Sequence, residues 1–190
     1  MYFKFLVASF FALGAISAVV ASPEPSALEK RQSSEIDIKL RLAVDNLKTA
    51  VAVILPKIDK VVATVGSVGD SIVPLLQELV DVLDRTAVTI DIISKTGQAS
   101  IVVVDEIARA VALIYTDIIK CTNDALGKRP TFKDVFTKSG LEAALVKFLS
   151  SLNGVLSGVV KAISALLKLL SPVLNALGWT RLVAALNIQA

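Results

Sequence analysis

Histidine is absent from this chain of 190 residues, and Cys121 is its only cysteine. The most common general base and metal ligand is therefore missing, and no disulfide can form within the chain. Aromatic residues make up 5% of the sequence, too few to interleave with its sparse basic residues as a nucleic-acid surface requires. These absences argue against an enzyme and against nucleic-acid binding, and we expect no cofactor.

Motifs that carry chemistry are also lacking. The sequence contains neither a Gly-Xaa-Ser-Xaa-Gly elbow nor a glycine-rich phosphate loop. Glu78, Asp81 and Asp84 fall on one face of a predicted helix, and Arg85 is close by. This spacing is more typical of a solvated face with ion pairs than of a metal site, so we expect no bound metal.

The apolar content is high, at 54% of the residues, and consists mostly of Val, Leu, Ile and Ala. A chain of this length and composition can bury a sizeable core as one domain. No convincing strand pattern follows residue 32. The sequence predicts an all-α fold, a bundle of four to six helices with heptad-like apolar seams and a very hydrophobic C-terminal half.

The first 31 residues have the pattern of segments removed during export. Lys4 precedes an uncharged run over Phe5–Val20, and Ala21 ends a small-residue cleavage site, so residues 1–21 are predicted to be a signal peptide. Residues 22–31 end in Lys30 and Arg31 and resemble a propeptide cut after a dibasic pair. A charged linker is the alternative. The mature domain would then be residues 32–190, in the extracellular medium or a cell wall.

The front half of that domain, residues 35–126, reads as three helices. Apolar residues recur at alternating steps of four and three from Leu40 to Val82, with a break near Gly66–Asp70. We expect one helix that starts near Ser33–Glu35, is kinked at Pro56 and ends before this break. A second helix should cover residues 71–94, and a third residues 99–126. Cys121 lies on the apolar seam of the third, either buried or bridged to another chain.

The back half, residues 131–190, is more apolar. A short helix is predicted over residues 131–137, and a long organising helix over Leu141–Leu170. Its one polar stripe runs from Lys147 to Asn175 at steps of three and four. Pro172 should end or kink it, and residues 172–188 should form a last helix with the only tryptophan, Trp179.

Charge is unevenly divided between the halves. Residues 35–126 contain 13 acidic and 9 basic residues, whereas residues 128–190 contain 2 acidic and 8 basic ones. A basic, apolar back half suggests an anionic lipid surface or an acidic polymer, although the lysines could simply solvate the outward stripe. The longest uncharged run of the back half, Phe148–Val160, is too short for a membrane span, so we expect no stable transmembrane segment there.

Taken together, the signal segment, the dibasic pair Lys30–Arg31, the lone Cys121 and the apolar stretch Leu145–Leu170 resemble small secreted cell-wall proteins of mushroom-forming fungi, which act in aerial growth and attachment. The layout is similar, more distantly, to the fungal hydrophobic-surface-binding proteins, helical bundles related to lipid-binding cell-wall mannoproteins. The chain differs from these mannoproteins because it lacks a Ser/Thr-rich tail and an Asn-Xaa-Ser/Thr acceptor. It also lacks the eight cysteines of hydrophobins.

The leading hypothesis is a secreted, non-enzymatic surface protein that binds a hydrophobic surface or lipid, or associates with itself, through its C-terminal helices. Its predicted contact residues are Leu149, Leu152, Leu156, Val160, Leu167 and Trp179. One alternative is a soluble carrier of a lipid or fatty acid, which should copurify with it. A second is a membrane-active toxin or effector whose Leu141–Leu186 hairpin inserts and releases dye from vesicles.

Overall fold

The structure is a computed structural model that describes residues 25–64 and 71–188, with side chains from residue 35 onward. All regular elements in these ranges are helical, as the sequence predicts. They are α1 (Pro25–Ala63), α2 (Val73–Ser94), η2 (Ile101–Val103), α3 (Val104–Lys128), η3 (Pro130–Phe132), α4 (Lys133–Lys138), α5 (Leu141–Val155), α6 (Val159–Leu167), η4 (Lys168–Leu170), α7 (Ser171–Leu177) and α8 (Thr180–Leu186).

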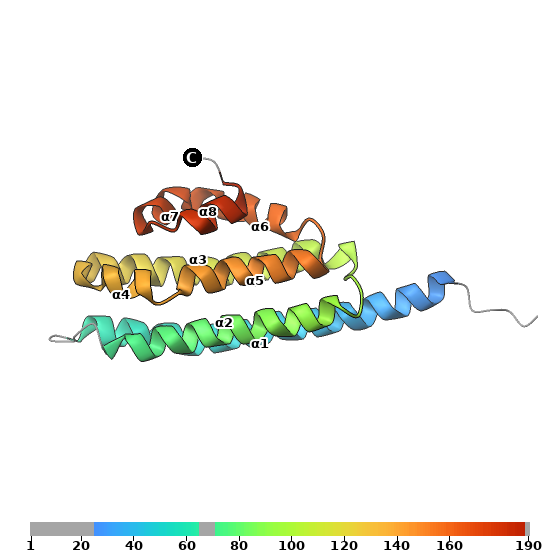
Figure 1. Ribbon diagram of the computed structural model, residues 1–190, viewed down its shortest axis with the longest axis horizontal. Helices are drawn as coiled ribbons and strands as arrows, with labels where there is room; N and C mark the ends of the chain where they lie inside the picture. Colours follow the sequence, from blue (N-terminus) through green and yellow to red (C-terminus); the bar gives the residue numbers. More distant parts are fainter. Residues whose placement is uncertain (1–24, 65–70, 189–190) are drawn as a thin grey trace, which may run out of the picture.

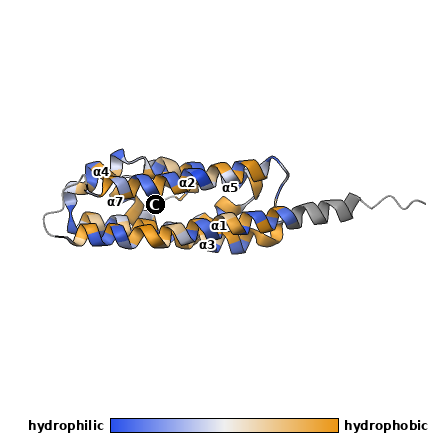
Figure 2. Cartoon of the chain, turned by 90° about the horizontal axis from the view of Figure 1, so that it is seen from below, coloured by the Kyte–Doolittle hydropathy of each residue, from blue (hydrophilic) through white to orange (hydrophobic). Residues whose placement is uncertain are grey.

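The helices form three layers (Figure 1). α1 and α2 make the first layer, α3 and α5 with α4 make the middle layer, and α6, α7 and α8 make the third. α1 packs on α2 and α3, and α2 packs most extensively on α5. From below, α1 and α3 follow one course and α2 and α5 another, and α7 is visible between the two pairs (Figure 2). The back half of the sequence therefore supplies part of the bundle and not a separate unit.

The heptad pattern accounts for the first layer. In α1 the side chains of Leu40, Leu47 and Ile54 are fully buried, which places one continuous stripe against α2 and α3. The helix starts at Pro25, earlier than expected, but Ile36 is its first buried residue among those with described side chains. Pro56 lies inside α1 on its exposed side, and the helix continues to Ala63.

The predicted seam shifts by one residue at the end of α1. The core contains Val62, Leu76 and Leu83, whereas the expected Val61, Leu75 and Val82 are only half-buried. Ile72 and Leu79 of the same seam are buried as expected, so periodicity read straight through the break finds half of these core positions and places the others one residue too early. The helix itself, Val73–Ser94, agrees closely with the expected residues 71–94, and Pro74 lies in its first turn, where no donor is lost.

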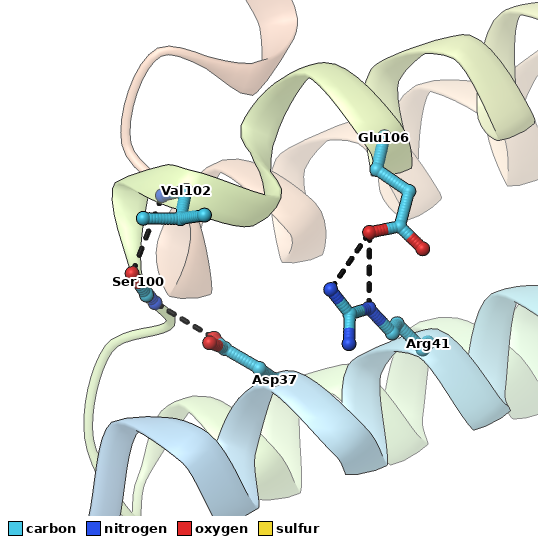
Figure 3. A network of polar contacts seen from close by, with 5 residues as sticks. All are labelled: Asp37, Arg41, Ser100, Val102 and Glu106. Carbon is cyan, nitrogen blue, oxygen red and sulfur yellow. Dashed lines mark hydrogen bonds and ion pairs between the residues drawn. The ribbon is translucent and has the colours of Figure 1, made fainter. Parts of the chain in front are cut away.

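Polar contacts join the start of α3 to α1 (Figure 3). The backbone N–H of Ser100 donates to Asp37 Oδ1 at 2.8 Å, and Ser100 Oγ accepts from the N–H of Val102 at 3.2 Å. Arg41 donates through Nε and Nη2 to Glu106 Oε2, at 3.1 and 2.7 Å. These contacts fix the turn between α2 and α3, so α3 runs along α1.

α3 and α5, both in the middle layer, make few close backbone contacts with each other. Side chains fill the space between them instead. The ring centroids of Tyr115 on α3 and Phe148 on α5 lie 6.3 Å apart at 38°, and the Tyr115 hydroxyl donates to the Leu145 carbonyl oxygen at 2.6 Å. Both rings are fully buried. The third layer covers this space, because α6 packs on α3 and α8 packs on α5.

The prediction of one helix over Leu141–Leu170 is wrong. α5 ends at Val155, Leu156 is extended at φ −135° and ψ 95°, and Gly158 has φ 83° before α6 begins. A positive φ strains any residue with a Cβ, so Gly158 allows the chain to leave α5 and cross to the third layer. Asn153 and Gly154, which are weak helix formers, come two to three residues before the extended Leu156 that follows the helix.

The final segment also differs from expectation. Residues 172–188 form two short helices, α7 and α8, because Gly178 ends α7 with φ 76° and Trp179 starts a new direction. The back half consequently contains more and shorter helices than predicted. This division lets α7 and α8 fold back over α3 and α5, whereas one straight helix would extend past them.

Candidate interfacial surface of the C-terminal helices

The inward side of the third layer is well packed. Val159, Ile163 and Leu167 of α6 are buried against the middle layer, and so are Leu174 of α7 and Leu182 of α8. A carboxylate strengthens this docking, because Glu142 Oε1 on α5 accepts the backbone N–H groups of Arg181 and Leu182 at 2.7 and 3.1 Å. Glu142 thus satisfies two free donors at the start of α8, and its negative charge interacts favourably with the positive end of the α8 dipole.

The outward side carries exposed leucines. Leu169 in η4 is 90% exposed and Leu166 in α6 is 49% exposed. Beside them, four exposed residues recur at steps of four and three. They are Lys161, Ala165, Lys168 and Pro172. We call these six residues the outer face. Leaving a leucine side chain in water forgoes about 1.5–3 kcal/mol of burial, so an exposed pair is an observation that needs a reason.

The segment that bears the outer face is unusually apolar for its exposure. Val159–Leu177 has a mean hydropathy of 1.5 and is long and apolar enough to cross a membrane, by length and composition alone. Only 28% of it is buried. Buried core helices can be equally long and apolar, but most of their surface is covered. Here the inward residues are covered by the bundle and the outward ones are exposed.

Charge around the outer face has one sign. The chain from Ala143 to Ala190 has four basic residues and no acidic one. Within the described part of the chain, the side chains of Lys161, Lys168 and Arg181 make no ion pair. All three side chains are exposed, and Lys161 and Lys168 belong to the same helical segment as the leucines. An amphipathic segment with cations at its edge is the arrangement found where proteins lie on interfaces.

Other exposed apolar side chains lie in a different setting. Ile38 and Leu42 of α1, and Val88 and Ile92 of α2, are about half exposed, on helices whose outer surfaces mix apolar and charged residues (Figure 2). Ile101 and Val102 are more than 80% exposed. Acidic and basic residues both occur near these positions in sequence, whereas α6, η4, α7 and α8 contain basic residues and no acidic one.

The six contact residues predicted from sequence lie mainly in the core. Leu149, Leu152, Leu156, Leu167 and Trp179 are at most 4% exposed, and Val160 is half-buried. They can touch an external surface only after the third layer leaves the bundle. Substituting Asp for Leu156 would therefore disrupt folding before it could report on adsorption. Sequence reasoning missed Leu166 and Leu169, because an apolar helix does not reveal which side its neighbours will cover.

Cys121 is buried at the α1–α3 contact, as one of the two sequence alternatives predicts. Its Sγ lies 3.6 Å from Asp59 Oδ1. Burial, with a smaller contribution from the Asp59 carboxylate, raises the pKa of the thiol from 9.0 to about 12. The thiol is therefore protonated and poorly nucleophilic at neutral pH.

The acidic residues of α2 pair with different cations. Lys57 lies 3.6 Å from Glu78, Arg85 lies 3.9 Å from Asp81, and Lys147 Nζ lies 2.8 Å from Asp84. All are substantially exposed, so each pair contributes little to stability. In the described part of the chain, no group of three potential metal ligands occurs.

A small cavity of about 240 Å³ lies between α2 and α4. It is bordered by Val73, Leu76, Gln77, Asp134, Val135, Lys138 and Ser139. Ligand pockets for small molecules usually measure about 300–1,000 Å³, so this cavity is small for an acyl chain. The space between α3 and α5 is filled by Tyr115 and Phe148.

Of the predicted processing residues, Ala21 lies outside the described range. Lys30 and Arg31 fall in the first turns of α1, ahead of its buried stripe, so a cut after Arg31 would leave Ile36 and the core intact. The sequence matches no protein-family model, and no curated protein is detectably similar to it.

Proposed function

We propose that this is a secreted, non-enzymatic surface protein that adsorbs to apolar–water interfaces through the outer face of its C-terminal helices. Export and placement in a wall or the medium rest on the signal-like N-terminus and on the resemblance to fungal cell-wall proteins. The interfacial role rests on one structural observation. Leu166 and Leu169 stay exposed on a segment apolar enough for a membrane, while one side of that segment, with Val159, Ile163, Leu167 and Leu174, is packed on the bundle.

Adsorption in this form needs no unfolding. The inward residues of α6 and α7 remain on α3, and the two leucines enter the apolar phase while Lys161 and Lys168 reach back to water. Burying the exposed surface of Leu169 and the exposed half of Leu166 yields roughly 2–4 kcal/mol before the costs of association. Such an anchor gives reversible adsorption of a folded protein.

The test compares two double variants of the mature protein on alkylated silica. Leu166→Ser with Leu169→Ser should weaken adsorption at least about tenfold, because each substitution removes one apolar anchor. Ile38→Ser with Leu42→Ser removes similarly exposed apolar side chains from the opposite layer and serves as the matched control. Circular dichroism checks that both variants remain folded. Equal loss of adsorption in both variants would contradict the assignment to the outer face.

A further inference from the structure

A hollow borders the outer face on its polar side. It measures about 380 Å³ and is lined by Ser164, Ala165, Lys168, Asn187 and Ile188. Lys168 belongs to both the hollow and the outer face, so the two are continuous. The hollow offers an ammonium, a hydroxyl and a carboxamide, all of which donate hydrogen bonds, and no described acidic side chain lines it.

These donors suit an anionic oxygen group, and the position of the hollow indicates which kind of molecule carries that group. Phosphate oxygens accept from ammonium, hydroxyl and amide donors. Leu169 lies one residue from Lys168 and is the most exposed of the large apolar side chains described, so a molecule at the hollow would have its apolar part beside Leu169. A lipid has both parts, whereas an acidic polysaccharide has no acyl chains for the leucines. Lys161, seven residues before Lys168, adds a second charge on the same face.

We infer that the surface recognised by the outer face is an anionic phospholipid layer, with the lipid phosphate at Lys168, Ser164 and Asn187 and the acyl region against Leu166 and Leu169. This inference rests on the proposed interfacial function and names its partner. The charge of the layers supports it, because residues 159–188 contain three basic residues and no acidic one, whereas residues 35–63 and 73–94 of the first layer contain eight acidic and six basic ones. An anionic layer attracts the third layer and repels the first, and so orients the protein.

The experiment measures binding of the mature protein to vesicles of phosphatidylcholine alone and with about 30% phosphatidylglycerol. We expect at least tenfold tighter binding to the anionic vesicles at low ionic strength, a preference that falls sharply in about 0.5 M NaCl. Lys161→Gln with Lys168→Gln should weaken binding to anionic vesicles by about fivefold per lysine and leave binding to neutral vesicles unchanged. Ser164→Ala with Asn187→Gly should weaken binding to anionic vesicles and leave binding to neutral vesicles unchanged. Glycine is used at position 187 because it tolerates the left-handed backbone conformation of Asn187.

The matched control is Lys48→Gln with Lys60→Gln, which removes the same charge from exposed positions of α1 in the opposite layer. Loss of the anionic preference in the Lys161 and Lys168 variant but not in this control supports the inference. Equal loss in both would show that only net charge matters and would overturn it.

Three further outcomes separate this inference from the function it rests on. Equal binding of the unsubstituted protein to both vesicle types overturns the inference and leaves the interfacial function intact. Failure to bind either vesicles or alkylated silica overturns both. Displacement of the protein from vesicles by millimolar glycerol phosphate would assign the site to a soluble anion and overturn the lipid partner. Displacement by soluble polygalacturonate would do the same if the Leu166 and Leu169 substitutions had no effect on binding.

Discussion

Glu142, in the first turn of α5, accepts hydrogen bonds from the backbone of Arg181, 39 residues later in the chain, at 2.7 Å. The same oxygen accepts the N–H of Leu182. This carboxylate therefore performs, from another helix, the task of an N-cap side chain for α8, whose own preceding residue is Trp179 and supplies no capping oxygen.

Replacing Glu142 with Ala should loosen α8 and lower the free energy of unfolding by about 1–2 kcal/mol, the usual cost of losing a cap. Trp179 precedes α8, is buried and is the only tryptophan, so its fluorescence reports on this docking without labelling. Acrylamide should quench it more strongly in the variant. Glu78→Ala removes an exposed ion pair instead and should leave quenching unchanged. Unaltered quenching in the Glu142 variant would show that packing alone holds α8.

Two glycines four residues apart should respond in opposite directions to alanine. Gly158 has φ 83°, so Gly158→Ala places a Cβ in a strained conformation and should destabilise the protein by about 1–2 kcal/mol. Gly154 lies within helix α5 with open space around its Cα, so Gly154→Ala should stabilise by about 0.5–1 kcal/mol. Urea unfolding measures both. Stabilisation by Gly158→Ala would contradict the left-handed turn between α5 and α6.

Removing the Tyr115 hydroxyl should cost stability without creating a large cavity. Tyr115→Phe keeps the ring contact with Phe148 but loses the bond to the Leu145 carbonyl oxygen, at a cost of about 0.5–1.5 kcal/mol. Burial raises the pKa of Tyr115 well above 10.0, so the folded state keeps the proton that the unfolded state releases near pH 10. Its contribution to stability is complete below that pH and decreases above it, by up to about 1.4 kcal/mol per pH unit.

The same variant tests this alkaline dependence. Stability measured by urea unfolding from pH 8 upward should decline less steeply for Tyr115→Phe than for the unsubstituted protein, since the variant has no buried phenol at this position. A decline of equal slope would mean that the Tyr115 hydroxyl ionises freely in the folded protein and is not sealed between α3 and α5.

The Cys121 thiol should react very slowly with a water-soluble disulfide reagent at pH 8, because it is buried and its pKa is raised to about 12. The unfolded state releases this proton near pH 9, so the thiol's contribution to stability is complete below pH 9 and is lost as pH rises toward 12. Cys121→Ala should flatten this part of the profile. Labelling of the native protein at the rate seen in urea, or a disulfide-linked dimer, would contradict the buried state.

Much of the fold could be predicted because local pattern and final packing agree. The all-α class, the bounds of α2 and the buried positions of α3, such as Ile107 and Val111, follow from apolar spacing and from Pro and Gly positions. The break at Leu156 to Gly158 could not be located in the same way. Gly154 and Gly158 are equally flexible in sequence, and only the docking of α6 on α3 decides which of them takes a positive φ.

The candidate surface was harder to predict than the fold. Leu167 and Leu169 have the same side chain two positions apart, yet one is fully buried and the other is 90% exposed. Two residues apart on a helix, their side chains point about 200° apart, so the spacing places them on opposite sides, but apolar spacing alone does not say which side docks on α3. The lysines Lys161 and Lys168 were the usable signal, because they mark the side of α6 that faces water.

Two helices that pack on α2 and α3, namely α5 and α6, come late in the sequence and are therefore synthesised late. α2 packs mainly on α5 and α3 packs on α6, so neither can bury its second apolar side until the last third of the chain has been synthesised. The first 128 residues leave the ribosome with a core seam exposed, and contacts so distant in sequence form slowly. We therefore expect the nascent front half to be prone to aggregation until the C-terminal third has been translated and can cover this seam.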